Sequence, residues 1–185
     1  MIEQCPVGIM QLDKEFIWLH KLYTDSKAKT VVEIGSHYGG SLYFWIRDAA
    51  PGALVVSVDI GTWNPYGRLA QWFEWTKAKD VLLFPLIGDS KNKNILKQVS
   101  KIAAPIDFLF IDGSHTEESA QADFDNYWPM VRKGGICAMH DIAPEHANQE
   151  AYGVHRVWEK IKAAGIRTEE MVTEKSNCGV GVAFK

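Results

Sequence analysis

The chain is poor in cysteine, carries no excess of basic residues and has no long apolar run. Its 185 residues include three cysteines, which are too few and too scattered for a disulfide scaffold or a zinc site. No apolar run approaches the ~18 residues of a membrane span. The first ten residues lack the basic cluster of a signal peptide. These absences predict a protein of the reducing cytoplasm without a membrane partner.

The charge balance is slightly acidic. Twenty Lys and Arg residues stand against 23 Asp and Glu residues, for a formal charge of -3. A chain of this charge lacks the broad basic face on which nucleic-acid binding usually depends, so no nucleic-acid partner is expected. Hydrophobic residues make up 46% of the chain and charged residues 23%, close to the average of globular proteins. This composition argues against disorder, collagen and coiled coil.

Apolar runs alternate with segments of helical character along the chain. Each run is apolar throughout, which is typical of strands buried on both faces of a parallel sheet. The runs are 30–34, 53–60, 81–87, 106–111 and 135–139. The predicted helices between and after them are 41–49, 90–103, 116–131 and 151–164, with Ser90 and Thr116 as N-caps. This alternation predicts a doubly wound α/β sheet.

The two ends of the chain add to this pattern. Two further strands, 168–173 and 179–184, are joined by the short polar segment 174–177, which predicts a hairpin and an antiparallel last strand. Residues 1–185 are thus expected to form one domain with a seven-stranded sheet. Residues 1–29 form a helical extension, whose apolar residues recur at spacings of three and four. It packs on the sheet edge or, alternatively, covers the ligand.

Acidic residues follow or end nearly every predicted parallel strand. In open α/β sheets, ligands bind outside the carboxyl ends of the strands. Carboxylates gathered at one edge repel one another and need cations or hydroxyl groups as partners. The residues at these positions are Glu33, Asp59, Asp89, Asp112, and His140 with Asp141.

The turn after the first strand is glycine-rich but lacks the dinucleotide fingerprint. Gly35 and Gly39 are present, whereas His37 stands where the second glycine of G-x-G-x-x-G would be. Glu33, just before the turn, suits a cationic ligand better than a phosphate. Asp59 is placed to accept hydrogen bonds from ribose hydroxyls, and Asp89 to reach an adenine amino group. Together they predict a pocket for an adenosine compound with a cationic amino-acid end.

These residues resemble a known family. The E-x-G-x-x-x-G motif of residues 33–39, the acid that ends the second strand and the antiparallel last strand look like class I S-adenosylmethionine-dependent methyltransferases. Residues 106–115 and 133–141 resemble one branch of that class, as does the segment 153–158. This branch contains macrocin- and mycinamicin-type sugar O-methyltransferases and cephalosporin-hydroxylase-like proteins.

The resemblance implies a Rossmann-like fold with S-adenosylmethionine as methyl donor and a small hydroxylated molecule as acceptor. It also implies a divalent metal, usually magnesium, that holds the acceptor hydroxyls. The residues expected to contact the donor are Glu33, Gly35, Ser36, Gly39, Asp59, Ile60, Asp89, Ser90 and Asp112.

The metal and the catalytic base are expected at the ends of the fourth and fifth strands. Asp112 and Asp141 can share a divalent cation such as magnesium or manganese if their strands are neighbours. The family's D-x-x-H motif matches Asp112 and His115, and it implies that His115 removes the proton from the acceptor hydroxyl. His140 stands where the sugar methyltransferases carry an acid. It is either a ligand for a softer metal or no ligand, and strand alternation would point it away from Asp141.

The segment 61–79 is rich in aromatic residues. Trp63 is a candidate to stack on the adenine ring, and Trp72 and Trp75 share one helix face. We expect this pair to pack on the sheet or to form a dimer contact. The alternative is that Trp63, Tyr66 and Arg68 line the acceptor pocket.

Two other function classes stay open at this stage. A nicotinamide-dependent (NAD(P)) oxidoreductase would share the fold, although Glu33 and His37 count against a pyrophosphate. A noncatalytic donor-binding protein on a methyltransferase scaffold is compatible with His140 in place of an acid. Nucleic-acid methylation is disfavoured by the charge and by the absence of an N/D-P-P-Y/F/W motif after the fourth strand. A homo-oligomer that lends walls to the site is a further alternative for so short a chain.

Overall fold

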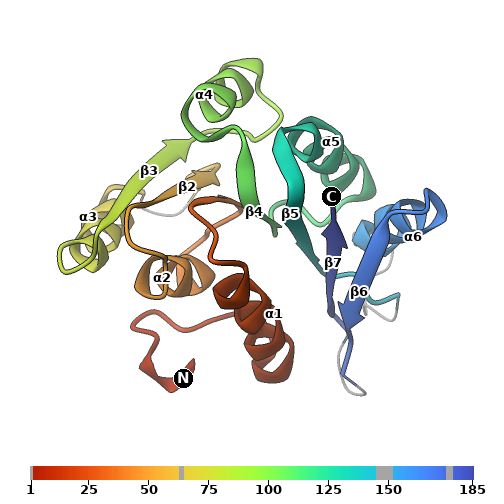
Figure 1. The fold of residues 1–185 in the computed structure, drawn as a ribbon, viewed down its shortest axis with the longest axis horizontal. Helices are drawn as coiled ribbons and strands as arrows, with labels where there is room; N and C mark the ends of the chain where they lie inside the picture. Colours follow the sequence, from red (N-terminus) through yellow and green to blue (C-terminus); the bar gives the residue numbers. More distant parts are fainter. Residues whose placement is uncertain (1, 63–64, 145–151, 174–176) are drawn as a thin grey trace.

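The fold is a single twisted sheet covered by helices on both faces (Figure 1). The computed structural model describes residues 2–62, 65–144, 152–173 and 177–185. Within them, seven strands form a sheet in the order β3-β2-β1-β4-β5-β7-β6. Strands β1 to β5 pair in parallel, whereas β7 is antiparallel to both β5 and β6. The strands are β1 (Thr30–Ile34), β2 (Ala53–Asp59), β3 (Val81–Ile87), β4 (Ile106–Ile111), β5 (Val131–His140), β6 (Arg167–Met171) and β7 (Val180–Phe184).

This topology confirms the predicted Rossmann-like, mostly parallel sheet with an antiparallel last strand. The order reverses between β1 and β4, which is the point where ligands bind in such sheets. The helices are α1 (Asp13–Ser26), α2 (Gly40–Arg47), α3 (Pro65–Thr76), α4 (Lys93–Ala103), α5 (Glu117–Tyr127) and α6 (Val154–Ala163).

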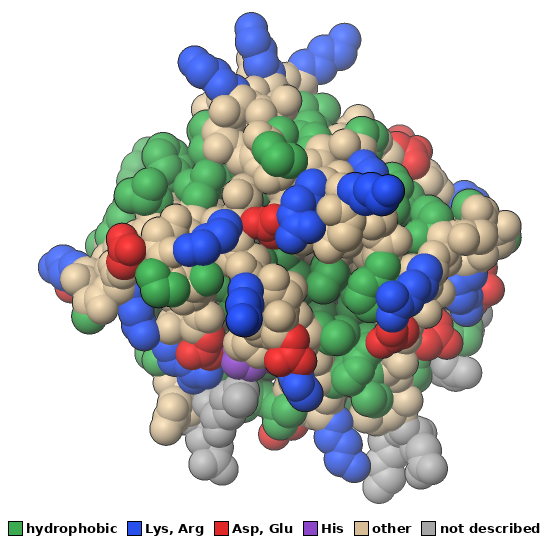
Figure 2. Space-filling model, viewed as in Figure 1, with side chains coloured by type: hydrophobic (Ala, Val, Ile, Leu, Met, Phe, Trp, Pro, Cys, Tyr) green, Lys and Arg blue, Asp and Glu red, His purple; other side chains and the backbone are tan. Residues whose placement is uncertain are grey.

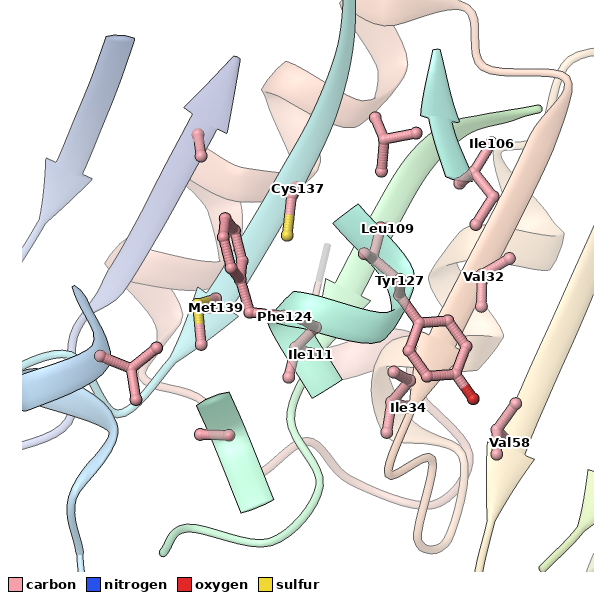
Figure 3. Close-up of a cluster of buried hydrophobic side chains, with 14 of the residues drawn as sticks. Val32, Ile34, Val58, Ile106, Leu109, Ile111, Phe124, Tyr127, Cys137 and Met139 are labelled. Carbon is pink, nitrogen blue, oxygen red and sulfur yellow. The ribbon is translucent and has the colours of Figure 1, made fainter. Parts of the chain in front are cut away.

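Two hydrophobic clusters hold the helices to the two faces of the sheet. Side chains alternate along a strand, so neighbouring residues of β1 enter different clusters. Val31 packs with side chains of α1 and α2, and Val32 packs with side chains of α4, α5 and α6. Figure 3 shows Phe124 and Tyr127 of α5 lying against strand side chains of the cluster that contains Val32. This packing fixes the carboxyl ends of β1, β4 and β5 next to one another.

Several predicted helix boundaries are wrong by two or more residues. The helix expected over 116–131 ends at Tyr127, a 3₁₀ turn (Trp128–Met130) follows, and β5 already begins at Val131. Pro129 within that turn lacks the N–H that a continuing helix would need. Thr116 caps α5 as predicted, because its side chain accepts a hydrogen bond from the Ser119 N–H. The helix expected from residue 90 begins at Lys93, and its N-cap is Asn92 rather than Ser90.

The third strand is not buried on both faces, contrary to expectation. Leu82 is 63% exposed, Phe84 42% and Ile87 46%. β3 lies at the edge of the sheet and pairs only with β2, so helices cover it incompletely. An apolar run therefore identified the strand correctly but not its position in the sheet.

The N-terminal helix packs onto the same face of the sheet as α2. Phe16 and Leu19 of α1 have no exposed surface and Tyr23 is 1% exposed, and all three contact the cluster that contains Trp45. The segment is expected to pack on the sheet edge, whereas α1 packs on the face of the sheet that α2 also covers. Met10 and Gln11, which precede α1, reach the carboxyl ends of the parallel strands.

The surface carries charges of both signs. The face in Figure 2 shows lysine and arginine side chains projecting at the top, where Figure 1 places α4, and acidic and basic groups interspersed elsewhere. In the described part of the chain, no helix combines the length and apolar character needed to cross a membrane.

Candidate active site

A cavity of about 690 Å³ opens at the carboxyl ends of the parallel strands. It lies where the strand order reverses, between the loops that follow β1 to β5. Most of the residues expected from the sequence line it. These are Gly35, Asp59, Ile60, Asp89, Ser90, Asp112, His115, His140 and Asp141. Glu33, Ser36 and Gly39 are not among the lining residues.

Glu33 is buried beneath the cavity rather than exposed to it. It alternates with Ile34 and so shares the face of Val31, where α2 covers the sheet. Its carboxylate accepts hydrogen bonds from Ser36 Oγ at 2.5 Å, Ser41 Oγ at 2.5 Å and Trp45 Nε1 at 2.8 Å. Burial nevertheless raises the pKa of Glu33 to about 7. The structure thus places Glu33 where it ties the glycine turn to α2.

Asp59 organises the rim of the cavity at the end of β2. One carboxylate oxygen accepts a hydrogen bond from the His37 N–H and the other from the Gly61 N–H, each at 2.8 Å. His37 has a φ of 49°, a left-handed conformation that non-glycine residues adopt at a cost. The His37 carbonyl accepts a hydrogen bond from Arg68, so the strained residue is held on both sides. Gly39 in the same turn leaves room for Trp72, because a Cβ at this position would lie 2.4 Å from Trp72 Nε1.

Asp89 and Ser90 follow β3 on the far side of the same cavity. Asp89 accepts a hydrogen bond from the Lys91 N–H at 2.9 Å, which fixes the carboxylate at the rim. Ser90 donates to Asp123 of α5 at 2.6 Å. Burial raises the pKa of Asp123 to about 6. This hydrogen bond fastens the loop after β3 to α5.

His115 and Asp141 form a hydrogen-bonded pair at the cavity wall. Nδ1 of His115 donates to the Asp141 carboxylate, since an ionised carboxylate can only accept. This hydrogen bond raises the pKa of His115 above its ordinary value. The His115 side chain is 42% exposed, whereas that of Asp141 is 4% exposed. An accessible imidazole oriented by a buried carboxylate can accept a proton from a bound hydroxyl group.

His140 lies between the two aspartates. Its Nδ1 is 3.1 Å from Asp112 Oδ1 and 3.4 Å from Asp141 Oδ1. Burial alone would lower the pKa of His140, but the charge and hydrogen bond of Asp112 and the charge of Asp141 raise it to about 9. Strand alternation did not separate His140 from Asp141, contrary to expectation. β5 ends at His140, and Asp141 has a φ of 60°, which turns its side chain back toward the same cluster.

Sequence reasoning missed residues that reach this cluster from distant segments. Gln11 donates to Asp112, and Met10 lines the cavity. Glu15 of α1 is fully buried, and its charge acts on both His140 and Cys178. Cys178, which follows no parallel strand, lines the cavity as well. The predicted hairpin could have indicated Cys178. Val180 of β7 pairs with His140 of β5, and this pairing places the residues just before β7 at the end of β5.

The donor atoms at this end of the sheet fit a divalent cation. Oxygen or nitrogen atoms of Asp112, His115 and Asp141 all lie within 4.8 Å of one another. A ring nitrogen of His140, an Asp141 oxygen and Cys178 Sγ also all lie within 4.8 Å of one another. Asp141 belongs to both sets. Two carboxylates within reach of an imidazole match the oxygen and nitrogen ligands of common divalent ions.

The aromatic segment is mostly structural. Trp72 is 3% exposed, donates to the Tyr38 carbonyl at 3.1 Å, and joins the cluster of α1 and α2 together with Trp75. The expectation that this pair packs on the sheet is confirmed. Tyr66 is 80% exposed and, like the buried Arg68, is not among the residues that line the main cavity. Trp63 lies outside the described residues.

Comparison with known proteins identifies the family. Residues 32–142, more than half of the chain, match the family described as a methyltransferase domain. The chain belongs to this family. The match begins in β1 and ends just after β5, so it spans the strands that build the cavity.

Two relatives share parts of the sequence. Demethylmacrocin O-methyltransferase of Streptomyces fradiae is 26% identical over 104 residues, which are 56% of this chain and 23% of that protein. The uncharacterized protein y4gI of Sinorhizobium fredii is 22% identical over 144 residues, which are 74% of this chain and 15% of that protein. The aligned parts thus cover less than a quarter of the length of either relative.

Solved methyltransferase structures share the fold. An O-methyltransferase from Bacillus cereus in complex with SAH aligns with a TM-score of 0.74 and 19% identity, over 99% of this chain and 86% of that one. The MycE methyltransferase of mycinamycin biosynthesis, in complex with Mg, SAH and mycinamycin VI, aligns with a TM-score of 0.63 and 18% identity, over 91% of this chain and 48% of that one. These structures show a shared fold, and the sequence match to demethylmacrocin O-methyltransferase supports the predicted resemblance to that branch of the methyltransferases.

Proposed function

We propose that the chain transfers a methyl group from S-adenosylmethionine to a hydroxyl oxygen of a small molecule. The observation that carries this proposal is the opening of the His115–Asp141 pair into the same cavity as Asp59 and Asp89. One part of the cavity can hold an adenosine compound, and another offers a base for a hydroxyl group. The O-methyltransferases among the relatives and solved structures support the same reaction.

The charge of the cavity favours a cationic donor. Four aspartates line it, namely Asp59, Asp89, Asp112 and Asp141. They attract the sulfonium and ammonium groups of S-adenosylmethionine and repel the pyrophosphate of a dinucleotide. Asp59 is already fixed by two backbone N–H groups, so its remaining lone pairs can accept hydrogen bonds from ribose hydroxyls without reorganisation.

His115 acts as the general base in the proposed reaction. Because Nδ1 donates to Asp141, the neutral ring offers the lone pair of Nε2. Nε2 takes the proton of the acceptor hydroxyl as the oxygen attacks the methyl carbon. The bond between that carbon and the sulfonium sulfur breaks, and S-adenosylhomocysteine leaves as a neutral thioether. Asp141 stabilises the imidazolium, which then releases its proton to solvent.

A divalent cation is part of this proposal. Asp112 and Asp141 would hold it, and His140 and Cys178 are further candidate ligands. When bound, such an ion lowers the pKa of a coordinated hydroxyl and orients the acceptor. Gln11, which donates to Asp112, would fix the orientation of that carboxylate.

Donor binding and methyl transfer test the proposal separately. Calorimetry compares S-adenosylhomocysteine with NAD, and transfer is followed with methyl-labelled S-adenosylmethionine and a panel of sugars and catechols. We expect the protein to bind S-adenosylhomocysteine but not NAD. We also expect it to form a labelled product, and His115→Gln should abolish this product. His155→Gln is the matched control, because His155 is not among the lining residues. Binding of NAD instead would favour an oxidoreductase, and a folded protein that binds neither ligand would overturn the proposal.

A further inference from the structure

We infer that His140, Asp141 and Cys178 form a site for a divalent cation of the zinc type, with the Cys178 thiolate as one of its ligands. The part such an ion would play in methyl transfer rests on the proposed function, whereas its binding does not. The three donors come from the end of β5 and from the segment before β7. The imidazole and the thiolate distinguish this site from the cation site that Asp112 and Asp141 alone would form.

The three donors are already gathered in the structure. One ring nitrogen of His140, one oxygen of Asp141 and Sγ of Cys178 all lie within 4.8 Å of one another. The Cys178 carbonyl accepts a hydrogen bond from the Ala143 N–H at 2.7 Å, which fastens this segment to the chain that follows β5. Pairing of His140 with Val180 holds the two strand ends together. The cluster is thus built by the sheet itself.

Two buried polar atoms, one of them on a residue of this cluster, lack hydrogen-bond partners among the described residues. Nε2 of His140 is one, in a residue that is 6% exposed. Oε2 of Glu15 is the other, in a residue with no exposed surface. Buried polar atoms are nearly always hydrogen-bonded, so the unpartnered Nε2 of His140, a residue of the cluster itself, points to a missing ligand. Glu15 also lies close enough for its charge to act on both His140 and Cys178.

The surroundings of His140 resemble those of metal-binding histidines. Such histidines usually donate their second ring N–H to a carboxylate, which fixes the tautomer and makes the ligating nitrogen more basic. Asp112 Oδ1 is 3.1 Å from Nδ1 of His140 and occupies that second position. A cation on Nε2 would leave this hydrogen bond in place.

The donor set selects the class of cation. Sulfur and nitrogen ligands favour zinc and similar transition metals, whereas magnesium prefers oxygen ligands and retains several waters. Binding replaces the thiol S–H bond of Cys178 and the Nε2–H bond of the His140 imidazolium by bonds to the metal, and both protons are released to solvent. The overlapping set of Asp112, His115 and Asp141 contains no sulfur. Sulfur ligation of the bound metal therefore distinguishes the two sites and can be measured.

Cobalt(II) reports directly on sulfur ligation. The whole chain, treated with chelator and reducing agent, is titrated with Co²⁺ alone and followed by absorbance. We expect a thiolate-to-cobalt charge-transfer band in the near ultraviolet, which Zn²⁺ abolishes and excess Mg²⁺ does not. Cys178→Ser should remove the band, and Cys5→Ser, at another half-buried cysteine, should retain it.

A second measurement covers the case in which Cys178→Ser does not fold. In the unmodified chain, Zn²⁺ should protect Cys178 from alkylation by at least tenfold in rate while Cys5 reacts unchanged, as read by mass spectrometry. No charge-transfer band, a band that survives Cys178→Ser, or equal alkylation with and without Zn²⁺ would overturn the inference. S-adenosylhomocysteine binding on the same samples separates the two proposals, since either result can fail while the other stands.

Discussion

Asp141 holds the imidazole of His115 from 26 residues further along the chain. The carboxylate is 4% exposed and the imidazole 42% exposed, so the buried partner orients the accessible one. Because Asp141 accepts the Nδ1 proton, the second ring nitrogen of the neutral imidazole is an acceptor. This pairing makes His115, rather than His140, the residue suited to take a proton from a ligand in the cavity.

Replacing His115 should separate catalysis from binding. His115→Gln should lower the rate of methyl transfer by about 10²- to 10⁴-fold, the usual contribution of a general base. The affinity for S-adenosylhomocysteine should change little, because His115 is expected to contact the acceptor. Labelled-methyl transfer and calorimetry on the same sample measure the two effects. Equal losses in binding and transfer would contradict a role as base.

Asp59 should carry a large share of the donor affinity. Its carboxylate lines the cavity and also holds the strained turn through the His37 N–H. Loss of a hydrogen bond to a charged group costs about 1.5–3 kcal/mol, so Asp59→Ala should weaken S-adenosylhomocysteine binding by roughly 10- to 100-fold. Asp80→Ala, at an exposed aspartate outside the cavity, is the control. Calorimetry should find the S-adenosylhomocysteine affinity of Asp80→Ala unchanged. Equal effects of both variants would contradict the assignment of Asp59 to donor binding.

Glu33 should make stability depend on pH. Burial raises its pKa from 4.5 to about 7, so the folded state binds the proton more tightly than the unfolded state. The stabilisation from this proton is complete below pH 4.5 and is lost as the pH rises through 7. The loss is on the order of 3 kcal/mol, by the free-energy equivalent of a pKa difference. Asp123, with a pKa raised to about 6, acts in the lower part of the same window.

A neutral variant isolates this contribution. In Glu33→Gln, urea unfolding between pH 4.5 and 8 should lack the decline that Glu33 causes in the wild type. Asp123 and the histidines are present in both proteins, so their effects drop out when the free energy of unfolding of Glu33→Gln is subtracted from that of the wild type at each pH. Glu74→Gln, at an exposed glutamate paired with Lys77, should follow the wild type at every pH. A constant difference between wild type and Glu33→Gln would show that the Glu33 carboxyl is not perturbed.

The strand-end rule accounts for most of the site that the sequence predicted. Parallel strands end at one edge of the sheet, so the acids after β2, β4 and β5 had to come together. This rule does not say which face a side chain takes near the end of a strand. Glu33 precedes the last residue of β1 and follows the alternation of that strand toward α2, away from the cavity. Asp141 instead depends on a left-handed backbone that no pattern indicated.

Residues from outside the strand ends could not be found in this way. Gln11 and Glu15 reach the aspartates and His140 only because α1 packs beside α2, which is a matter of tertiary packing. Cys178 depends on the register between β5 and β7. The fold itself was predictable because strand–helix alternation is a local pattern, whereas exposure of β3 reflects the position of that strand at the sheet edge.

Gly35 should be required for the close approach of the loops after β1 and β4. A Cβ at this position would lie 2.1 Å from the Asp112 carbonyl oxygen and 2.6 Å from Gly113 Cα. These are backbone atoms that cannot rotate away, and Asp112 donates its N–H to the Ile34 carbonyl at 2.9 Å in the same contact. Gly35→Ala should therefore force the two loops apart and displace Asp112 from the cavity wall.

Gly165→Ala separates this collision from backbone strain. Gly35 and Gly165 have similar positive φ angles, 87° and 75°, but a Cβ at Gly165 would meet nothing within 4 Å. Both substitutions thus carry the left-handed strain of about 1–2 kcal/mol, and only Gly35→Ala adds the steric overlap. In urea unfolding, Gly35→Ala should lose at least about 2 kcal/mol more than Gly165→Ala, in the range of severe packing defects. Only Gly35→Ala should also lose S-adenosylhomocysteine binding. Equal losses of stability would mean that the two loops can separate freely, and that Asp112 is not held in place by the turn after β1.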